Sequence, residues 1–160
     1  MLSPESVPVA DVEMPASAIA RGSWRLSRDD LVAFGERMGR ALAPPHVVAL
    51  SGDLGSGKTT LAQAICRGYG VKENVTSPTF ALVHAYEGKH STVYHCDLYR
   101  LRDESELTNI GWDDLLNERA LVLIEWPERA GSRLPEEVTH LHLDHVGDQT
   151  DVRVLTVGLE

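Results

Sequence analysis

The stretch from Gly52 to Thr60 constrains the fold more than any other part of this chain. It reads GDLGSGKTT and matches the pattern G-x-x-x-x-G-K-[ST], a glycine loop that surrounds the phosphates of a nucleotide. The apolar run 46–51 comes before it and predicts a buried strand. Residues 59–69 follow with apolar positions one helical turn apart, and Gly70 stands where a helix commonly ends. Strand, glycine loop and helix in this order direct backbone N–H groups toward a polyphosphate, so the sequence predicts a nucleotide site.

The residues of this loop have distinct chemical tasks. Its glycines let the phosphates approach the backbone closely. Lys58 places a positive charge near the β- and γ-phosphates, and the Thr59 hydroxyl is a ligand for Mg²⁺. A chance match in a glycine-rich turn is the alternative, and the flanking strand and helix argue against it. The predicted nucleotide contacts are Asp53, Leu54, Gly55, Ser56, Gly57, Lys58, Thr59 and Thr60.

Two acids beyond the loop are candidates for the metal, because phosphoryl chemistry needs a partner for Mg²⁺ and a group that orients the nucleophile. Glu125 directly follows four apolar residues, 121–124, which are typical of a central strand. Asp97 lies near the end of a predicted strand, 92–99. Carboxylates are the ligands that Mg²⁺ prefers. The alternatives are a charge that leaves the core at a strand end for Glu125 and a turn acid for Asp97.

Other polar and aromatic positions are less decisive. Thr79 follows a Ser-Pro pair and either reaches the γ-phosphate, as a switch threonine does, or begins an ordinary turn. Trp126 either covers the nucleotide or packs against the core, and packing is the simpler interpretation. His140, His142 and His145 lack an organised carboxylate, so we expect them on an edge strand without a metal.

The rest of the chain predicts an α/β fold. Residues 23–26 suggest an edge strand, and Ser27 a cap for a helix that ends before Pro44. The strands expected at 81–86 and 92–99 form a hairpin directly after the glycine-loop helix, which predicts a sheet of mixed direction and not a plain βαβ repeat. Short helices within 100–109 and at 112–117 and a closing hairpin of 138–145 with 152–157 complete the prediction.

Composition limits the classes of function. The net charge of −9 argues against broad electrostatic binding to nucleic acid or to an anionic membrane. No apolar run approaches the roughly 20 residues that cross a bilayer, and we expect no secretion signal. The two cysteines form no C-x-x-C pair, so we expect buried thiols and a cytoplasmic protein. Residues 1–22 are rich in Pro, Ala, Ser and Val, which predicts a disordered extension before a single domain at 23–160.

Five segments together resemble the TsaE (YjeE) family of small bacterial ATPases. They are GDLGSGKTT at 52–60, SPTF at 77–80, HCDLYRL at 95–101, ELTNIG at 106–111 and LIEWP at 123–127. The glycine loop alone is generic, whereas SPTF, DLYRL and EWP in this order are specific to the family. The resemblance extends over about residues 23–158.

The resemblance implies a function. The family acts in making threonylcarbamoyladenosine at position 37 of tRNA, together with the transferase TsaD and its paralogue TsaB. It hydrolyses ATP with Mg²⁺, weakly when alone, does not transfer the threonylcarbamoyl group itself and meets tRNA only through the complex. The implied fold is a three-layer α/β/α sandwich with a mixed sheet.

The resemblance also implies site residues. Lys58 binds the phosphates, Thr59 and Glu125 hold the metal, and Asp97 and Thr79 lie beside the γ-phosphate and matter for hydrolysis, with Asp97 also counted among the metal residues. The nucleotide further contacts, by the same resemblance, Ser27, Arg28, Trp126 and Glu128.

Two other functions remain open from the residues alone. A small-molecule kinase usually carries several arginines in a lid, and only Arg129 and Arg133 follow the 121–124 strand closely. A non-catalytic sensor would use ATP only to set a binding surface. A GTPase is disfavoured, because no N-K-x-D guanine motif occurs.

Overall fold

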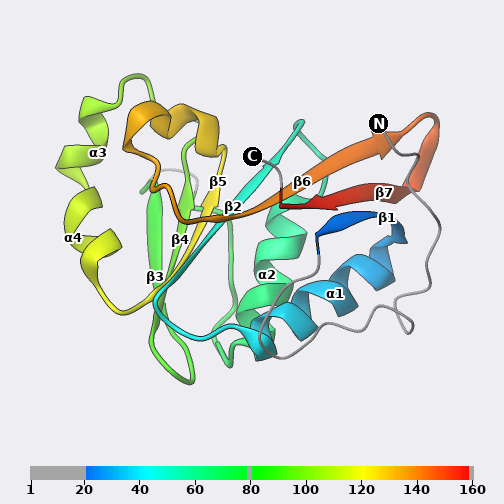
Figure 1. The fold of residues 1–160 in the computed structure, drawn as a ribbon, viewed down its shortest axis with the longest axis horizontal. Helices are drawn as coiled ribbons and strands as arrows, with labels where there is room; N and C mark the ends of the chain where they lie inside the picture. Colours follow the sequence, from blue (N-terminus) through cyan, green and yellow to red (C-terminus); the bar gives the residue numbers. More distant parts are fainter. Residues whose placement is uncertain (1–20, 79–80, 159–160) are drawn as a thin grey trace.

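The computed structural model describes residues 21–78 and 81–158. One sheet carries helices on both of its faces (Figure 1). The elements in chain order are β1 (Gly22–Ser27), α1 (Arg28–Ala41), β2 (His46–Gly52), α2 (Lys58–Gly68), β3 (Val83–Glu87), β4 (Thr92–Asp97), α3 (Ser105–Asn109), α4 (Trp112–Asn117), β5 (Leu121–Glu125), the 3₁₀ helix η2 (Pro127–Arg133), β6 (Thr139–Val146) and β7 (Gln149–Val157).

The sheet has the strand order β1-β7-β6-β2-β5-β4-β3. β2 is parallel to both β5 and β6, and β4 is parallel to β5. The pairs β3–β4, β6–β7 and β1–β7 are antiparallel. This confirms the mixed sheet, both predicted hairpins, the edge position of β1 and the central position of β5.

Alternating residues of β5 show that the sheet separates two cores. Leu121 and Leu123 belong to the cluster that α1 and α2 cover, whereas Val122 and Ile124 belong to the cluster under α3, α4 and η2. Successive side chains of a strand point to opposite faces, so the two clusters lie on opposite sides of the sheet. The three-layer α/β/α sandwich is confirmed, and because β5 is buried on both faces its polar C-terminal residue, Glu125, is buried as well.

Local signals place α1 as predicted. The Ser27 hydroxyl accepts a hydrogen bond of 3.1 Å from the backbone N–H of Asp30, as an N-cap does. Leu31, Phe34 and Met38 form the buried stripe of the helix. The cap fixes the start of α1 beside β1, which brings Arg28 close to the glycine loop.

Three details differ from the expectations. β4 ends at Asp97, not at residue 99, because the Asp97 carboxylate accepts the backbone N–H of Tyr99 and closes a turn. The helix η2 was not predicted, since its sequence has no apolar period. The expectation that His140 and His142 lie on an edge strand is wrong: β6 is interior, between β7 and β2. There the His142 ring pairs with the Ser51 hydroxyl at 2.7 Å and with Asp144 at 3.0 Å.

The N-terminal residues, the two cysteines and the helices also bear on the predictions. The proposed extension falls largely on residues 1–20, which lie outside the described residues, and β1 begins at Gly22. Cys66 and Cys96 are both buried and free, and burial raises the pKa of the Cys66 thiol to about 12. Among the helices of the described residues, none has the length and apolar content that a bilayer crossing requires.

The glycines of α1 and α2 bring these helices into close contact, and a methyl group there should destabilise the fold. A Cβ on Gly39 would lie 2.1 Å from the Ile65 carbonyl oxygen, which is backbone and cannot rotate away. We expect Gly39→Ala to lower the free energy of unfolding by about 1–3 kcal/mol, a typical cost of overpacking, despite the helix propensity of alanine. Urea denaturation measures this value. The control is Arg40→Ala at the exposed neighbouring position, expected within about 0.5 kcal/mol of wild type; an equally stable Gly39→Ala would contradict the close packing.

Candidate functional site

The glycine loop connects β2 to α2 at the C-terminal edge of the parallel strands. Gly52 has φ +140°, and a Cβ there would lie 2.5 Å from the Leu143 carbonyl oxygen of β6. Gly57, with φ +107°, is the N-terminal cap residue of α2. Residues with a Cβ rarely adopt these backbone angles. The two glycines therefore allow the sharp turn that connects β2 to the N-terminus of α2.

Lys58 is folded back against its own loop. Its Nζ donates to the carbonyl oxygens of Gly52 at 2.6 Å and Asp53 at 2.9 Å, and lies 4.2 Å from the centroid of the Trp126 ring. Burial lowers the pKa of Lys58, while the nearby Glu125, Glu128, Asp97 and Asp53 carboxylates act in the opposite direction. The ammonium is thus a buried cation held mainly by carbonyl oxygens and surrounded by acids.

Glu125 is buried at the end of β5 and faces the first turn of α2. The Thr59 hydroxyl donates to its two carboxylate oxygens at 3.0 and 3.3 Å. The ring Nε2 of His95, on the neighbouring strand β4, lies 2.6 Å from Glu125 Oε2, and both side chains are almost completely buried. A hydroxyl and a carboxylate from two different elements therefore meet beside Lys58.

Asp97 is the register partner of Glu125 across the parallel pair β4–β5. Its carboxylate accepts hydrogen bonds from the Ser77 hydroxyl at 3.1 Å and from the backbone N–H of Tyr99 at 3.0 Å. The two predicted acids thus end adjacent strands on the same edge of the sheet, as their positions at the ends of predicted strands indicated.

Trp126 closes the site from the side of η2. Its backbone is left-handed, with φ +57°, a conformation that costs a non-glycine residue of order 1–3 kcal/mol. The ring centroid lies 5.0 Å from that of Tyr99, with the two rings tilted by 46°, and the ring covers the Lys58 ammonium. Trp126 packs against the core cluster and also borders the cavity, so packing is confirmed, and the contact with a nucleotide stays a prediction.

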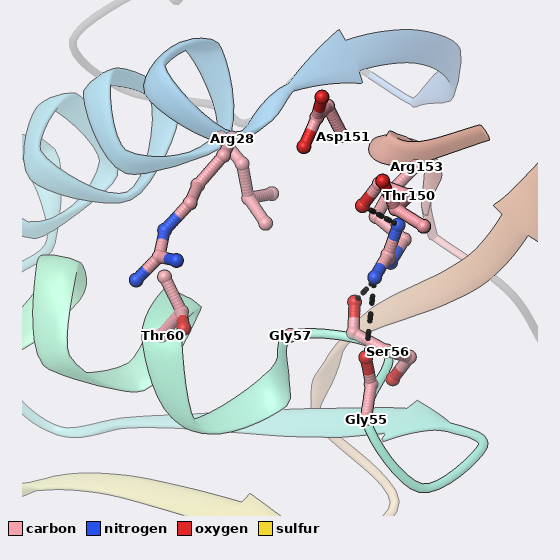
Figure 2. Close-up of a pocket in the computed structure, with 9 residues that line it drawn as sticks. Arg28, Gly55, Ser56, Gly57, Thr60, Thr150, Asp151 and Arg153 are labelled. Carbon is pink, nitrogen blue, oxygen red and sulfur yellow. Dashed lines mark hydrogen bonds between the residues drawn. The ribbon is translucent and has the colours of Figure 1, made fainter.

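Two cavities lie on either side of the loop and share Gly55, Gly57 and Thr60. The larger, of about 330 Å³, is bordered by the residues just described, including Lys58, Thr59, Asp97, Glu125 and Trp126. The smaller, of about 190 Å³, extends toward the start of α1 and the β6–β7 turn. Figure 2 shows the smaller cavity, with Arg28 on one side and Arg153 on the other.

The structure brings most of the predicted site residues together. Lys58, Thr59, Glu125, Asp97 and Trp126 border the larger cavity, with the loop residues Leu54, Gly55 and Gly57. Arg28 borders the smaller one. Ser27 and Glu128 do not line these two cavities. Ser27 caps α1. Glu128 is exposed, and its negative charge opposes the lowering of the Lys58 pKa by burial. Thr79 lies outside the described residues.

The sequence interpretation missed three contributors: His95, Ser77 and Arg153. His95 and Ser77 contact the two acids, and Arg153 contacts the loop. For His95 a signal existed, because residue 95 precedes Asp97 by two and therefore shares its face of the strand. For Arg153 none existed, because the contact joins residues 97 apart in sequence.

The comparisons with known proteins give one consistent result. The family model "Threonylcarbamoyl adenosine biosynthesis protein TsaE" matches residues 26–154. Proteins named "tRNA threonylcarbamoyladenosine biosynthesis protein TsaE" are 37% identical in Haemophilus influenzae (78% of this chain, 82% of the relative) and 33% identical in Bacillus subtilis (84% and 85%). The crystal structure of YdiB from B. subtilis superposes with a TM-score of 0.72 at 27% identity, covering 88% of this chain and 86% of YdiB.

Proposed function

The chain belongs to the TsaE family of tRNA threonylcarbamoyladenosine biosynthesis proteins, and from that premise we propose that it is an Mg²⁺-dependent ATPase of the cytoplasm that binds a TsaD–TsaB pair. One observation supports the ATPase most directly. The Thr59 hydroxyl and the Glu125 carboxylate meet at 3.0 Å beside the buried Lys58 ammonium. A loop hydroxyl and a strand-end carboxylate are the pair that holds Mg²⁺ in P-loop nucleotide hydrolases.

The donor set fits this ion. Mg²⁺ prefers oxygen ligands and is commonly held by one or two protein groups plus phosphates and water, so Thr59 and Glu125 suffice as direct ligands. Asp97 is close enough in register to contribute through a water molecule. The ion, when bound, neutralises the charge that develops on the transferred phosphoryl group.

The chain's own residues supply the other requirements. We assign to Lys58 the β- and γ-phosphates, in exchange for its present carbonyl contacts. Loop N–H groups at the start of α2 complete the phosphate cradle. Asp97, oriented by Ser77, and Thr79 are assigned to the γ-phosphate side, where the attacking water must be held. Arg28 and Trp126 are assigned to the rest of the nucleotide, with Ser27 and Glu128 nearby.

Neither arginine of η2 supports the kinase alternative. Arg129 donates to the Leu101 carbonyl, and Arg133 donates to the Glu104 carbonyl, to Thr108 and to Asp113. Both therefore brace η2 against the α3 region and do not border either cavity beside the loop. Among the described residues no arginine borders the larger cavity, so we expect slow hydrolysis until a partner supplies a cationic group.

We predict that the TsaD–TsaB pair stimulates ATP hydrolysis. Phosphate release by the chain alone should be slow and should rise by about 10-fold or more with the pair present, because an added cationic group is worth a large factor in such sites. TsaD alone and TsaB alone are the controls. Phosphate release that is unaffected by the pair would contradict the proposed role, and a phosphorylated metabolite in place of free phosphate would favour a kinase.

A further inference from the structure

Arg153 reaches from β7 to the glycine loop. Its Nε donates to the Ser56 carbonyl at 3.1 Å and its Nη2 to the Gly55 carbonyl at 3.3 Å (Figure 2). We propose that Arg153 is a positioning residue: it orients the peptide groups of the loop for polyphosphate binding and so makes phosphate affinity depend on the β6–β7 hairpin. This inference rests on the proposed nucleotide site and adds a residue to it.

The hydrogen bond from Arg153 to the Ser56 carbonyl also determines where the Gly57 N–H points, because both groups belong to one peptide. In the described residues the one cis peptide is Pro44–Pro45, so the peptide between Ser56 and Gly57 is trans. A trans peptide directs its N–H opposite to its carbonyl. By holding the Ser56 carbonyl, Arg153 therefore turns the Gly57 N–H to the opposite side of the loop. This N–H belongs to the cap residue of α2, where anions bind helix N-termini.

The guanidinium is itself held in a fixed orientation. Its Nη1 donates to the carbonyl oxygens of Thr150 at 2.8 Å and Val152 at 2.9 Å, both in its own hairpin. Within the described part of the chain, none of the ion pairs found includes Arg153. The guanidinium therefore donates to four carbonyl oxygens, two of them from the loop. A cation on a carbonyl polarises the peptide and makes its N–H a stronger donor.

Lys58 cannot replace this restraint. Lys58 holds the carbonyl oxygens of Gly52 and Asp53, at the start of the loop, and is expected to leave them for the phosphates. Arg153 holds Gly55 and Ser56, in the second half, from the other side. The loop's own backbone bond, from Ser56 N–H to the Asp53 carbonyl, does not fix the peptide of Gly57. Arg153 is therefore the contact that persists when the nucleotide binds.

Binding measurements on variants test the proposal. Arg153→Ala removes the guanidinium and both of its hydrogen bonds to the loop. Arg153→Lys keeps the charge, but its ammonium cannot donate to both carbonyls in one plane. We expect each variant to bind ATP with Mg²⁺ about 10- to 100-fold more weakly by calorimetry, the range for losing hydrogen bonds to a charged group. The control is Arg25→Ala, an exposed arginine on the neighbouring strand β1, expected to bind as wild type.

Inorganic tripolyphosphate has no base or ribose, so its binding shows whether Arg153 acts on the phosphate-binding loop or contacts the rest of the nucleotide. Its affinity should fall by the same factor as that of ATP, because Arg153 acts on the phosphate cradle. A loss confined to ATP would overturn the proposal and place Arg153 at the base or ribose. Guanidinium ion added to Arg153→Ala should restore part of the affinity for ATP and for tripolyphosphate. Circular dichroism checks that the variant is folded. A folded variant whose affinities do not recover would also count against a positioning role.

One readout needs no nucleotide. The amide signal of Gly57 in ¹H–¹⁵N spectra of the free protein should move in Arg153→Ala and Arg153→Lys and stay in place in Arg25→Ala. A moved signal with weakened tripolyphosphate binding supports the proposal, and an unmoved signal overturns it. If wild type binds neither ATP nor tripolyphosphate, the proposed function fails, and the proposed role of Arg153 in phosphate affinity fails with it, whatever the Gly57 signal shows.

Discussion

Replacing Lys58 by methionine is expected to abolish ATP hydrolysis. Methionine keeps most of the apolar stem beside Trp126 but removes the one lysine that, among residues 21–78 and 81–158, borders the larger cavity. Loss of a preorganised charge at a developing anion costs about 10²–10³-fold in rate. We expect phosphate release in the presence of Mg²⁺ and the TsaD–TsaB pair to fall by at least that factor, and ATP affinity to fall by about 10-fold or more.

The matched control is Lys72→Met, which changes an exposed lysine on the connector after α2. Its phosphate release should equal that of wild type within about twofold, as for surface substitutions in general. Thermal unfolding separates catalysis from folding: Gly52 and Asp53, whose carbonyls Lys58→Met releases, are partly buried and exposed, respectively, so water can replace the ammonium and the melting temperature should change little. A Lys58→Met protein that keeps more than a tenth of the wild-type rate would remove the basis of the proposed site.

The sequence predicted the architecture well where a local pattern determines it. Four apolar residues at 121–124 gave a strand buried on both faces, and Ser27 gave the start of α1, because both signals depend on neighbours in the chain. The order of the strands in the sheet could not be predicted from the sequence. No local pattern says that β6 lies between β7 and β2, and this is why the histidines of β6 were expected on an edge.

The same division holds for the site. Lys58 and Thr59 follow from a contiguous motif, and Glu125 and Asp97 follow from strand ends that a parallel sheet must bring to one edge. His95 and Arg153 act through contacts between distant segments, over 30 and 97 residues of sequence. Such contacts depend on register and on the hairpin geometry, which one sequence without its fold does not specify.

Glu125→Gln is expected to separate stability from function. Glu125 is 2% exposed, and the hydrogen-bond partners of its carboxylate are the Thr59 hydroxyl and the His95 ring. Burying a charge costs several kcal/mol, which a neutral amide avoids, while the amide keeps one acceptor and gains donors. We therefore expect the melting temperature of Glu125→Gln to be unchanged or higher, and phosphate release to fall by about 10²–10³-fold.

The dependence on Mg²⁺ identifies the cause of that loss. If Glu125 holds the ion, the Mg²⁺ concentration that gives half-maximal hydrolysis or nucleotide affinity should rise by about 10-fold or more, the scale found for groups that support a metal. Without Mg²⁺, ATP should bind Glu125→Gln at least as tightly as wild type, because a negative charge facing the phosphates has been removed. Glu137→Gln, at an exposed position before β6, should show neither change. Weaker ATP binding without Mg²⁺, or an unaltered Mg²⁺ requirement, would mean that Glu125 supports the loop through Thr59 and does not hold the ion.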